Sequence, residues 1–245
     1  MAFHVKNKVA LVTGANRGIG RAIVEGLLGA GSTKVYLAVR DPSSTSDLEN
    51  DYGNRVKTLV ADMQDPASIN ALAERAPDVE LLVNNAGVLT PAEPLAQHAV
   101  ESLQKELAVN TYGLLYIAQA FSETLARNKG ALVQLNSVAS IKGFAGVSTY
   151  SASKAASYAL TQSLRDSWAE SGVQVLSVHP GPIATDMAAS AGMQDNAEPA
   201  SVVVDGIIDA LAAGKFHLFP DSVAQQFEQQ YRSYAENVIE AQVSA

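Results

Sequence analysis

The chain has 245 residues, of which 47% are hydrophobic, and a formal net charge of -8. That acidity argues against a nucleic-acid surface, and no apolar run approaches the roughly 20 residues that span a membrane. Cysteine is absent, which excludes disulfides, thiolate catalysis and zinc-thiolate sites, and the four histidines show no ligand spacing. We therefore expect no metal site. The N-terminus lacks the layout of a signal peptide, so a cytoplasmic protein is expected.

Apolar strand-like runs alternate along the chain with longer helical patterns. Near-continuous Val, Leu and Ile runs are typical of strands that are buried on both faces of a parallel sheet. This alternation predicts an α/β fold: a doubly wound, mostly parallel sheet with helices on both faces, a Rossmann-type three-layer sandwich. Strands are predicted at residues 9–12, 35–39, 56–60, 79–83, 131–135, 173–178 and 216–219. Helices are predicted at residues 19–28, 65–75, 100–127, 149–170 and 199–213.

Three segments describe the predicted domain organisation. Residues 1–245 are expected to form a single dinucleotide-binding and catalytic domain, because no linker, repeat or low-complexity tract interrupts the pattern. Residues 186–200, rich in small side chains, are predicted to form a substrate lid. Residues 222–243 are predicted to form a C-terminal helix, whose aromatic residues at helical spacing indicate packing on the core or on a partner subunit.

A glycine-rich turn lies between the first predicted strand and the first predicted helix. Gly14, Gly18 and Gly20 permit a tight turn and a close approach of backbone to phosphate groups. The N-terminal amides of the following helix would point at a pyrophosphate. This context favours a dinucleotide site over the alternative, a glycine turn with no ligand.

Two arginines bear on the choice of cofactor. An NAD-preferring site places an acidic residue after the second strand, where this chain has Val39 and then Arg40. Arg40 and Arg17 could bind a 2′-phosphate through charge-assisted hydrogen bonds, so NADP(H) is favoured over NAD(H). Asp41 would weaken this preference if the strand ended one residue later.

Tyr150 and Lys154 are four residues apart and therefore share one face of a predicted helix. An ammonium group beside a phenol is expected to lower the tyrosine pKa, which would let Tyr150 exchange a proton near neutral pH. The alternative is a surface tyrosine and a solvated lysine. The glycine turn upstream favours the catalytic interpretation.

With these motifs in order, the chain resembles the short-chain dehydrogenase/reductase family, densely over residues 8–187. Single residues that match are Asp62, Asn110 and Ser137, together with the Tyr150–Lys154 pair. The matching segments are Thr13-Gly14-Ala15-Asn16-Arg17-Gly18-Ile19-Gly20, Asn84-Asn85-Ala86-Gly87 and Pro180-Gly181-Pro182-Ile183-Ala184-Thr185. The cofactor-binding residues expected from the motifs are Gly14, Asn16, Arg17, Gly18, Ile19, Gly20, Arg40, Asp62, Met63, Asn85, Ala86, Gly87, Tyr150, Lys154, Pro180, Gly181, Ile183 and Thr185.

The resemblance implies a catalytic role for four residues. Ser137 would donate a hydrogen bond to the substrate oxygen, with Ser140 as the alternative serine. Tyr150 would supply the proton, Lys154 would hold the nicotinamide ribose, and Asn110 would anchor a water that leads the proton to solvent.

The function expected is that of an NADP(H)-dependent carbonyl reductase or alcohol dehydrogenase. Its small-molecule substrate would be a largely apolar ketone or aldehyde, because the surrounding segments offer Ile141, Phe144, Val147, Met187 and Met193. One alternative is a non-catalytic dinucleotide-binding regulatory protein, and another is an epimerase or dehydratase that uses bound cofactor catalytically. Family analogy makes a homodimer or homotetramer plausible.

Overall fold

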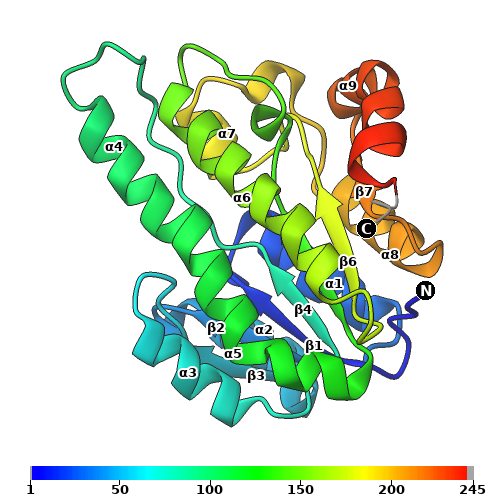
Figure 1. Ribbon diagram of the computed structural model, residues 1–245. Coiled ribbons are helices and arrows are strands. Elements are labelled where there is room, and N and C mark those ends of the chain that lie inside the picture. Colours follow the sequence, from blue (N-terminus) through cyan, green and yellow to red (C-terminus); the bar gives the residue numbers. More distant parts are fainter. Residues whose placement is uncertain (1, 242–245) are drawn as a thin grey trace.

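The computed structural model describes residues 2–241 and contains a seven-stranded sheet in the order β3-β2-β1-β4-β5-β6-β7 (Figure 1). Every neighbouring pair of strands is parallel, which confirms the predicted fold class. The chain enters the sheet in the middle and reverses direction between β1 and β4. The strands are β1 (Val9–Thr13), β2 (Lys34–Val39), β3 (Val56–Val60), β4 (Leu81–Asn84), β5 (Ala131–Leu135), β6 (Gln174–Val178) and β7 (His217–Leu218).

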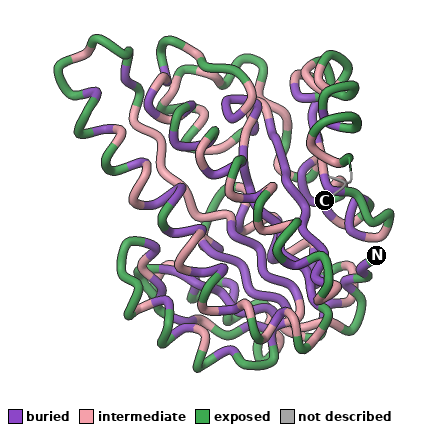
Figure 2. Tube along the Cα trace, in the orientation of Figure 1, coloured by how far each residue is buried: buried purple, intermediate pink, exposed green. Residues whose placement is uncertain are grey.

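Helices cover both faces of this sheet, and the strands between them are almost entirely buried (Figures 1 and 2). Alternate residues of one strand serve the two faces. Ala10 and Val12 join the core beneath α1 and α8, whereas Leu11 joins the core beneath α3 and α5. The helices are α1 (Gly18–Gly29), α2 (Ser46–Tyr52), α3 (Pro66–Arg75), α4 (Ala99–Glu106), α5 (Gly113–Asn128), α6 (Ser148–Ser167), α7 (Asp186–Ser190), α8 (Ser201–Ala212) and α9 (Ser222–Tyr234).

The largest departure from the predicted elements lies in the helix expected over residues 100–127. A π-helical turn, Leu107–Tyr112, separates α4 from α5 and adds one residue to the helical turn that carries Asn110. Helix α2 was not predicted, because it is short and polar and buries only Leu48. By contrast, α3 begins where expected, since the Asp65 carboxylate accepts a hydrogen bond from Ala67 N at 2.9 Å.

The segments predicted as a substrate lid and as a C-terminal helix both contain regular structure. Residues 186–200 contain α7 and a 3-10 turn at Gln194–Asn196, and Glu198 forms a β-bridge with Ile183 just before the segment. The predicted helix 222–243 consists of α9 and a π-helical turn at Ala235–Ile239, and its last two residues lie outside the described range. Phe227 and Tyr231 pack on the chain's own core, whereas Tyr234 and Val238 are exposed.

Residues 2–241 contain no helix whose length and apolarity would suit a membrane crossing. The same part of the chain contains no group of three or more His, Asp or Glu side chains arranged to hold a metal ion.

Candidate active site

The carboxyl ends of the central strands open onto a cleft of about 640 Å³, at the point where the strand order reverses. Its lining joins the turn after β1, the ends of β2 and β3, the loop after β4 and the first turns of α6. All the predicted cofactor-binding residues line this cleft except Gly181 and Ile183.

These two exceptions have packing roles beside the cleft. The amide of Gly181 donates to Asp221 Oδ2 at 2.7 Å, and a Cβ at this position would lie 2.6 Å from Asp221 Oδ1. Ile183 is 3% exposed and belongs to the core beneath α1 and α8. The glycine therefore allows the segment after β6 to approach the N-terminus of α9, and the isoleucine fastens the same segment to the core.

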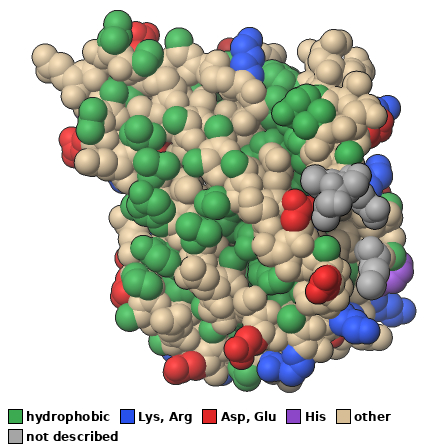
Figure 3. Space-filling view, in the orientation of Figure 1, with side chains coloured by type: hydrophobic (Ala, Val, Ile, Leu, Met, Phe, Trp, Pro, Cys, Tyr) green, Lys and Arg blue, Asp and Glu red, His purple; other side chains and the backbone are tan. Residues whose placement is uncertain are grey.

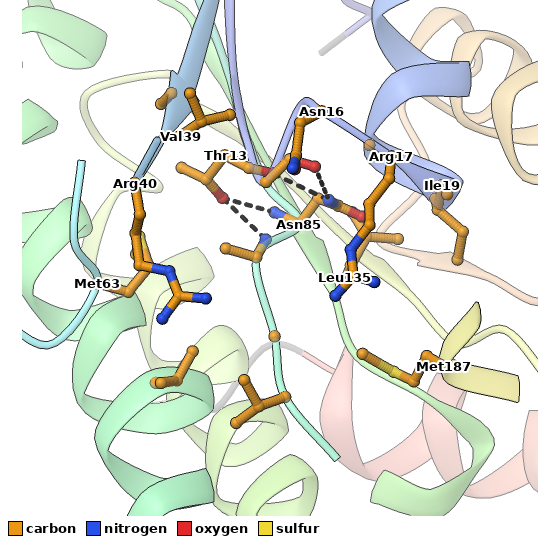
Figure 4. A pocket seen from close by; sticks show the side chains of 18 of the residues that line it. Thr13, Asn16, Arg17, Ile19, Val39, Arg40, Met63, Asn85, Leu135 and Met187 are labelled. Atoms are coloured by element: carbon orange, nitrogen blue, oxygen red, sulfur yellow. Dashed lines mark hydrogen bonds between the residues drawn. The ribbon is translucent and has the colours of Figure 1, made fainter. Parts of the chain in front are cut away.

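The glycine turn after β1 lets other groups come close to its backbone. Gly14 and Gly18 have positive φ angles of 64° and 54°, and a Cβ on Gly20 would lie only 2.1 Å from the carbonyl oxygen of Gly14. Thr13 Oγ1 accepts hydrogen bonds from the amides of Asn85 at 3.0 Å and Ala86 at 2.9 Å (Figure 4). These two hydrogen bonds join the end of β1 to the beginning of the loop after β4, beneath the glycine turn.

Both predicted arginines line the cleft, but they lie on opposite sides of it, Arg40 near Met63 and Arg17 on the side of Met187 (Figure 4). Strand β2 ends at Val39, so Arg40 is the first residue beyond it. The Asp41 carboxylate accepts from the amide of Ser43 at 2.9 Å and from its hydroxyl at 2.8 Å, and these bonds hold the Asp41 pKa below its usual range. Arg17 pairs with Asp186 Oδ2 at 3.1 Å.

The inner end of the cleft brings Tyr150 and Lys154 together with the segment after β5. Lys154 is 4% exposed, and its Nζ donates to Leu135 O at 2.6 Å and lies 5.8 Å from the centroid of the Tyr150 ring. Burial raises the pKa of Tyr150 to about 12, and the Ser137 hydroxyl offsets part of that effect. Burial also lowers the pKa of Lys154 to about 8.

The expected lowering of the Tyr150 pKa by Lys154 is therefore not what the structure shows. The direction is upward, because desolvation of the phenolate exceeds every favourable interaction with it. A tyrosine in this state is a phenol at neutral pH, which suits a proton donor rather than a base.

Asn110 holds the elements around the cleft in place. Its Oδ1 accepts from Val88 N at 2.9 Å, and its Nδ2 donates to Val88 O at 2.9 Å and to Ser153 Oγ at 3.0 Å. The side chain, which is 1% exposed, thus joins the π-helical turn to the loop after β4 and to α6. The water-anchoring role of Asn110 stays a prediction.

The structure separates the two candidate serines. Ser140 is buried, its hydroxyl donates to Ser137 O, and it lies 2.9 Å from His179 Nδ1. Ser137 is half-buried, its hydroxyl donates to Pro180 O at 3.4 Å and lowers the pKa of Tyr150, and it is not among the residues that line the cleft. Ser140 therefore supports the loop that carries Ser137, and the substrate-binding role of Ser137 stays a prediction.

His179 is a supporting residue that the sequence did not reveal. Its ring is fully buried, with Nε2 2.8 Å from Ser177 Oγ and Nδ1 3.2 Å from Ser137 O. The structure also brings its ring centroid within 5.8 Å of that of His217, although the two histidines are far apart in the chain.

The buried His179 should make the free energy of unfolding depend on pH. Burial, and to a smaller extent His217, lower the pKa of His179 from 6.5 to about 3. Between these two pH values His179 is protonated in the unfolded chain and neutral in the folded chain. The free energy of unfolding should therefore fall with pH between those values. From pH 7 to pH 5 we expect wild type to lose about 2 kcal/mol more than a His179→Asn variant in urea unfolding. An exposed-ring control, His98→Asn, should follow wild type, and a parallel loss in His179→Asn would refute the assignment.

Only one of the five predicted substrate contacts lines the cleft. Met187, 37% exposed, does so, whereas Phe144 packs against Phe227 with ring centroids 6.3 Å apart and Ile141 joins the same small core. The two remaining residues, Val147 and Met193, are absent from the lining. Apolar lining residues that the sequence did not indicate are Val88, Val109 and Leu135.

Comparison with known proteins agrees with this geometry. The family described as short chain dehydrogenase matches residues 8–196. The chain belongs to the short-chain dehydrogenase/reductase family. Members of this oxidoreductase family that are similar to it include 2-dehydro-3-deoxy-D-gluconate 5-dehydrogenase of Pseudoalteromonas atlantica, 33% identical over 192 residues that make up 75% of each chain. Oxidoreductase UcpA of Escherichia coli K12 is 31% identical over 95% of this chain and 93% of its own.

Solved structures of the short-chain dehydrogenase/reductase family superimpose closely. A short chain dehydrogenase from Burkholderia cenocepacia, in complex with NADP, has a TM-score of 0.88 and 32% identity over 97% of this chain and 99% of its own. A family member from Burkholderia phymatum, in complex with NAD, has a TM-score of 0.82 at 23% identity, over 99% of this chain and 100% of its own, and supports the fold.

Proposed function

We propose that this protein is an NADP(H)-dependent oxidoreductase that interconverts a largely apolar ketone or aldehyde and the corresponding alcohol. One observation carries the proposal: Tyr150 and Lys154, beside Ser137, stand at the inner end of a cleft whose outer end is a glycine turn. A dinucleotide-binding turn and a proton donor therefore open onto the same space.

The residues of the cleft fit a nicotinamide dinucleotide. The positive φ angles at Gly14 and Gly18 and the space beside Gly20 form a cradle that side chains would fill. The first turn of α1 directs its free amides toward that cradle, which suits a pyrophosphate. When bound there, the nicotinamide supplies or accepts the hydride.

The chain's own residues handle the carbonyl oxygen and its proton. Tyr150, protonated at neutral pH, donates its proton to the oxygen as negative charge develops there. Ser137 donates a second hydrogen bond to that oxygen and so orients the carbonyl. Lys154, buried and with its Nζ at Leu135 O, would hold the ribose of the cofactor, and Asn110 joins α6 to the loop after β4.

The preference for NADP(H) rests on the end of β2. The first residue beyond the strand is Arg40, and the nearest acid, Asp41, already caps its own 3-10 turn through Ser43. A guanidinium group at this place suits a 2′-phosphate. The related Burkholderia cenocepacia protein, whose structure contains NADP, supports the same preference.

Replacement of Arg40 by alanine should weaken NADPH binding about 10- to 100-fold, because a charge-assisted hydrogen bond contributes about 1.5–3 kcal/mol. NADH binding should change by less than about 2-fold, since NADH lacks the 2′-phosphate. Fluorescence titration with both cofactors measures this. Arg75→Ala, an exposed arginine outside the cleft lining, is the matched control. Equal weakening of both cofactors by Arg40→Ala would contradict the assignment.

A second candidate substrate is a carbonyl compound that carries a carboxylate. The 2-dehydro-3-deoxy-D-gluconate 5-dehydrogenase relatives favour it, and Arg17 lies at the mouth beside Met187. Because Arg17 pairs with Asp186, it would have to exchange that partner for the substrate. Two assays at 340 nm separate the two candidates: NADPH oxidation with acetophenone, 2-octanone and benzaldehyde, and NADP+ reduction with 2-dehydro-3-deoxy-D-gluconate, whose hydroxyl group would be the hydride donor.

The same assay tests the other two hypotheses. Saturable NADPH binding without turnover of any carbonyl would support a non-catalytic dinucleotide-binding regulatory protein. Turnover without stoichiometric consumption of NADPH would support an epimerase or dehydratase.

We also propose a homodimer or homotetramer. Hydrophobic side chains gather over α4 and α5 (Figure 3), where Val100 and Tyr112 are 69% and 50% exposed. Gel filtration with light scattering tests this proposal.

A further inference from the structure

Gln134 is a buried polar side chain that no step proposed above uses. It lies on β5, directly before Leu135, and its exposed fraction is 2%. It is not among the residues that line the cleft, so we expect no direct contact with a bound cofactor. A buried amide needs hydrogen-bond partners within the protein, because each missing partner costs free energy of folding. The partners of Gln134 therefore indicate what this side chain does.

On one face of the sheet, the side chains change from apolar to polar at the carboxyl ends of the strands. Alternate residues of a strand lie on the same face. Leu132 packs in the core beneath α3 and α5, and Gln134 follows it two residues later on that face. Gln134 stands in register with Asn84 of β4 and Ser177 of β6. It thus belongs to a row of polar side chains, Thr13, Asn84, Gln134 and Ser177, each at most 2% exposed.

Gln134 links this polar row to helix α6. Asn84 Nδ2 donates to Gln134 Oε1 at 2.8 Å, and Gln134 Nε2 donates to Ser157 Oγ at 3.1 Å. Asn84 Oδ1 in turn accepts from the hydroxyl of Thr13 at 3.2 Å, at the start of the glycine turn. Ser157 is 0% exposed and lies one helical turn after Lys154. A continuous chain of hydrogen bonds therefore connects the glycine turn with the helix that carries Lys154.

Gln134 also shares a hydrogen-bond acceptor with Lys154. Gln134 Nε2 donates to Leu135 O at 3.3 Å, and Lys154 Nζ donates to the same oxygen at 2.6 Å. A carbonyl oxygen accommodates two donors because it has two lone pairs. Leu135 and Lys154 both line the cleft. Gln134 therefore contacts the carbonyl group that binds the lysine and, through Ser157, the helix from which the lysine extends.

We propose that Gln134 is a positioning residue of the active site, which fixes the Lys154 ammonium group relative to the glycine turn. Lysine has a long, flexible stem, so an ordered Nζ needs an acceptor at a defined place. Leu135 O is that acceptor, and Gln134 binds it while it joins β4 and β5 to α6. The inference rests on the proposed function, because Lys154 is the residue proposed to hold the ribose of the cofactor.

The decisive variant is Gln134→Met, which removes both hydrogen-bonding groups and keeps an unbranched side chain of similar length. We expect the NADPH dissociation constant to rise about 5- to 20-fold, because Lys154 loses its fixed position at the nicotinamide ribose. Adenosine 2′,5′-bisphosphate lacks that ribose, so its dissociation constant should stay within about 2-fold of wild type. Isothermal titration calorimetry of the full chain measures both ligands. Equal weakening of both ligands would overturn the proposal.

A double-variant cycle tests whether Gln134 acts through Lys154. Lys154→Met alone should weaken NADPH binding about 10- to 100-fold, because it removes a charge-assisted hydrogen bond. Addition of Gln134→Met should weaken binding by less than about 2-fold more, since the group that Gln134 positions is already absent. If the two losses were additive in free energy, Gln134 would act by another route and the proposal would fail.

Two further variants keep the result interpretable. Thr161, 0% exposed on the same helix, accepts from Asn136 Nδ2 at 3.3 Å and donates to Ser157 O at 2.7 Å. Thr161→Val should leave NADPH binding within about 2-fold of wild type, because its hydroxyl contacts neither Leu135 O nor Lys154 Nζ. Ser157→Ala removes the partner of Gln134 on α6 and should weaken NADPH binding about 2- to 5-fold, which keeps the test available if Gln134→Met folds poorly.

The outcomes separate this inference from the proposed function. Unchanged NADPH binding in Gln134→Met or in Ser157→Ala overturns the positioning role. Equal weakening by Thr161→Val also overturns it, because any buried hydrogen bond of α6 would then have the same effect. Wild-type protein that fails to bind NADPH would instead refute the proposed function.

Discussion

Replacement of Tyr150 by phenylalanine should lower kcat/KM for carbonyl reduction by about 10²- to 10⁴-fold, the range that a positioned proton donor contributes. The variant loses only the hydroxyl, and the ring that packs beside Lys154 remains. NADPH binding should therefore stay within about 3-fold of wild type. Stopped assays of NADPH oxidation, together with fluorescence titration of NADPH, measure both quantities.

The same helix offers a matched control. Tyr158 lies two turns after Tyr150 and is buried, but its hydroxyl is 2.6 Å from His217 Nε2, and it is not among the residues that line the cleft. Tyr158→Phe should keep most of the wild-type kcat/KM, even if its thermal midpoint falls. If Tyr150→Phe retained more than about a tenth of wild-type activity, another group would have to supply the proton.

Replacement of Gly20 by alanine should disrupt the cofactor turn. The new Cβ would lie 2.1 Å from Gly14 O and 2.5 Å from Asn85 Nδ2, both closer than real carbon contacts. The backbone of the turn must therefore shift, and Asn85 must give up its hydrogen bond to Thr13 O. We expect NADPH binding to weaken by at least about 10-fold and the free energy of unfolding to fall by about 1–3 kcal/mol.

Gly29, the last residue of the same helix, is the control for this change. A Cβ there meets nothing within 4 Å, and its φ is not positive. Gly29→Ala should leave NADPH binding unchanged and should preserve or raise stability by about 0.5–1 kcal/mol. Urea unfolding and NADPH titration of both variants make the comparison. Equal behaviour of the two would show that the contacts around Gly20 do not constrain the turn.

Several features of the fold could be predicted because they depend on short stretches of chain. Apolar runs such as residues 35–39 fall within β2, because a continuous run of apolar side chains suits a strand that is buried on both faces of a parallel sheet. Asp65 and Pro66 begin α3 as expected, since capping involves neighbouring residues. The end of β2 at Val39, on which the cofactor prediction depends, was also correct.

Other features could not be predicted because they arise from contacts between distant segments. Phe144 was expected to contact substrate, but it packs against Phe227 of α9, about eighty residues away in sequence. The π-helical turn at Leu107–Tyr112 contains no proline or glycine that would indicate it in the sequence. It packs against α6 and the loop after β4. The pairing of His179 with the serine loop likewise needs the sheet to bring β6 beside β5.

The sequence by itself determined the α/β fold, the order of the motifs and the residue types that gather in the cleft. Those properties follow from local spacing, glycine freedom and apolar periodicity, which each segment carries with it. Only the tertiary structure decided the electrostatic state of the site, including the upward shift of the Tyr150 pKa and the downward shift of the Lys154 pKa. Proton affinity depends on desolvation and on charges from every surrounding element, and these exist only once the chain is folded.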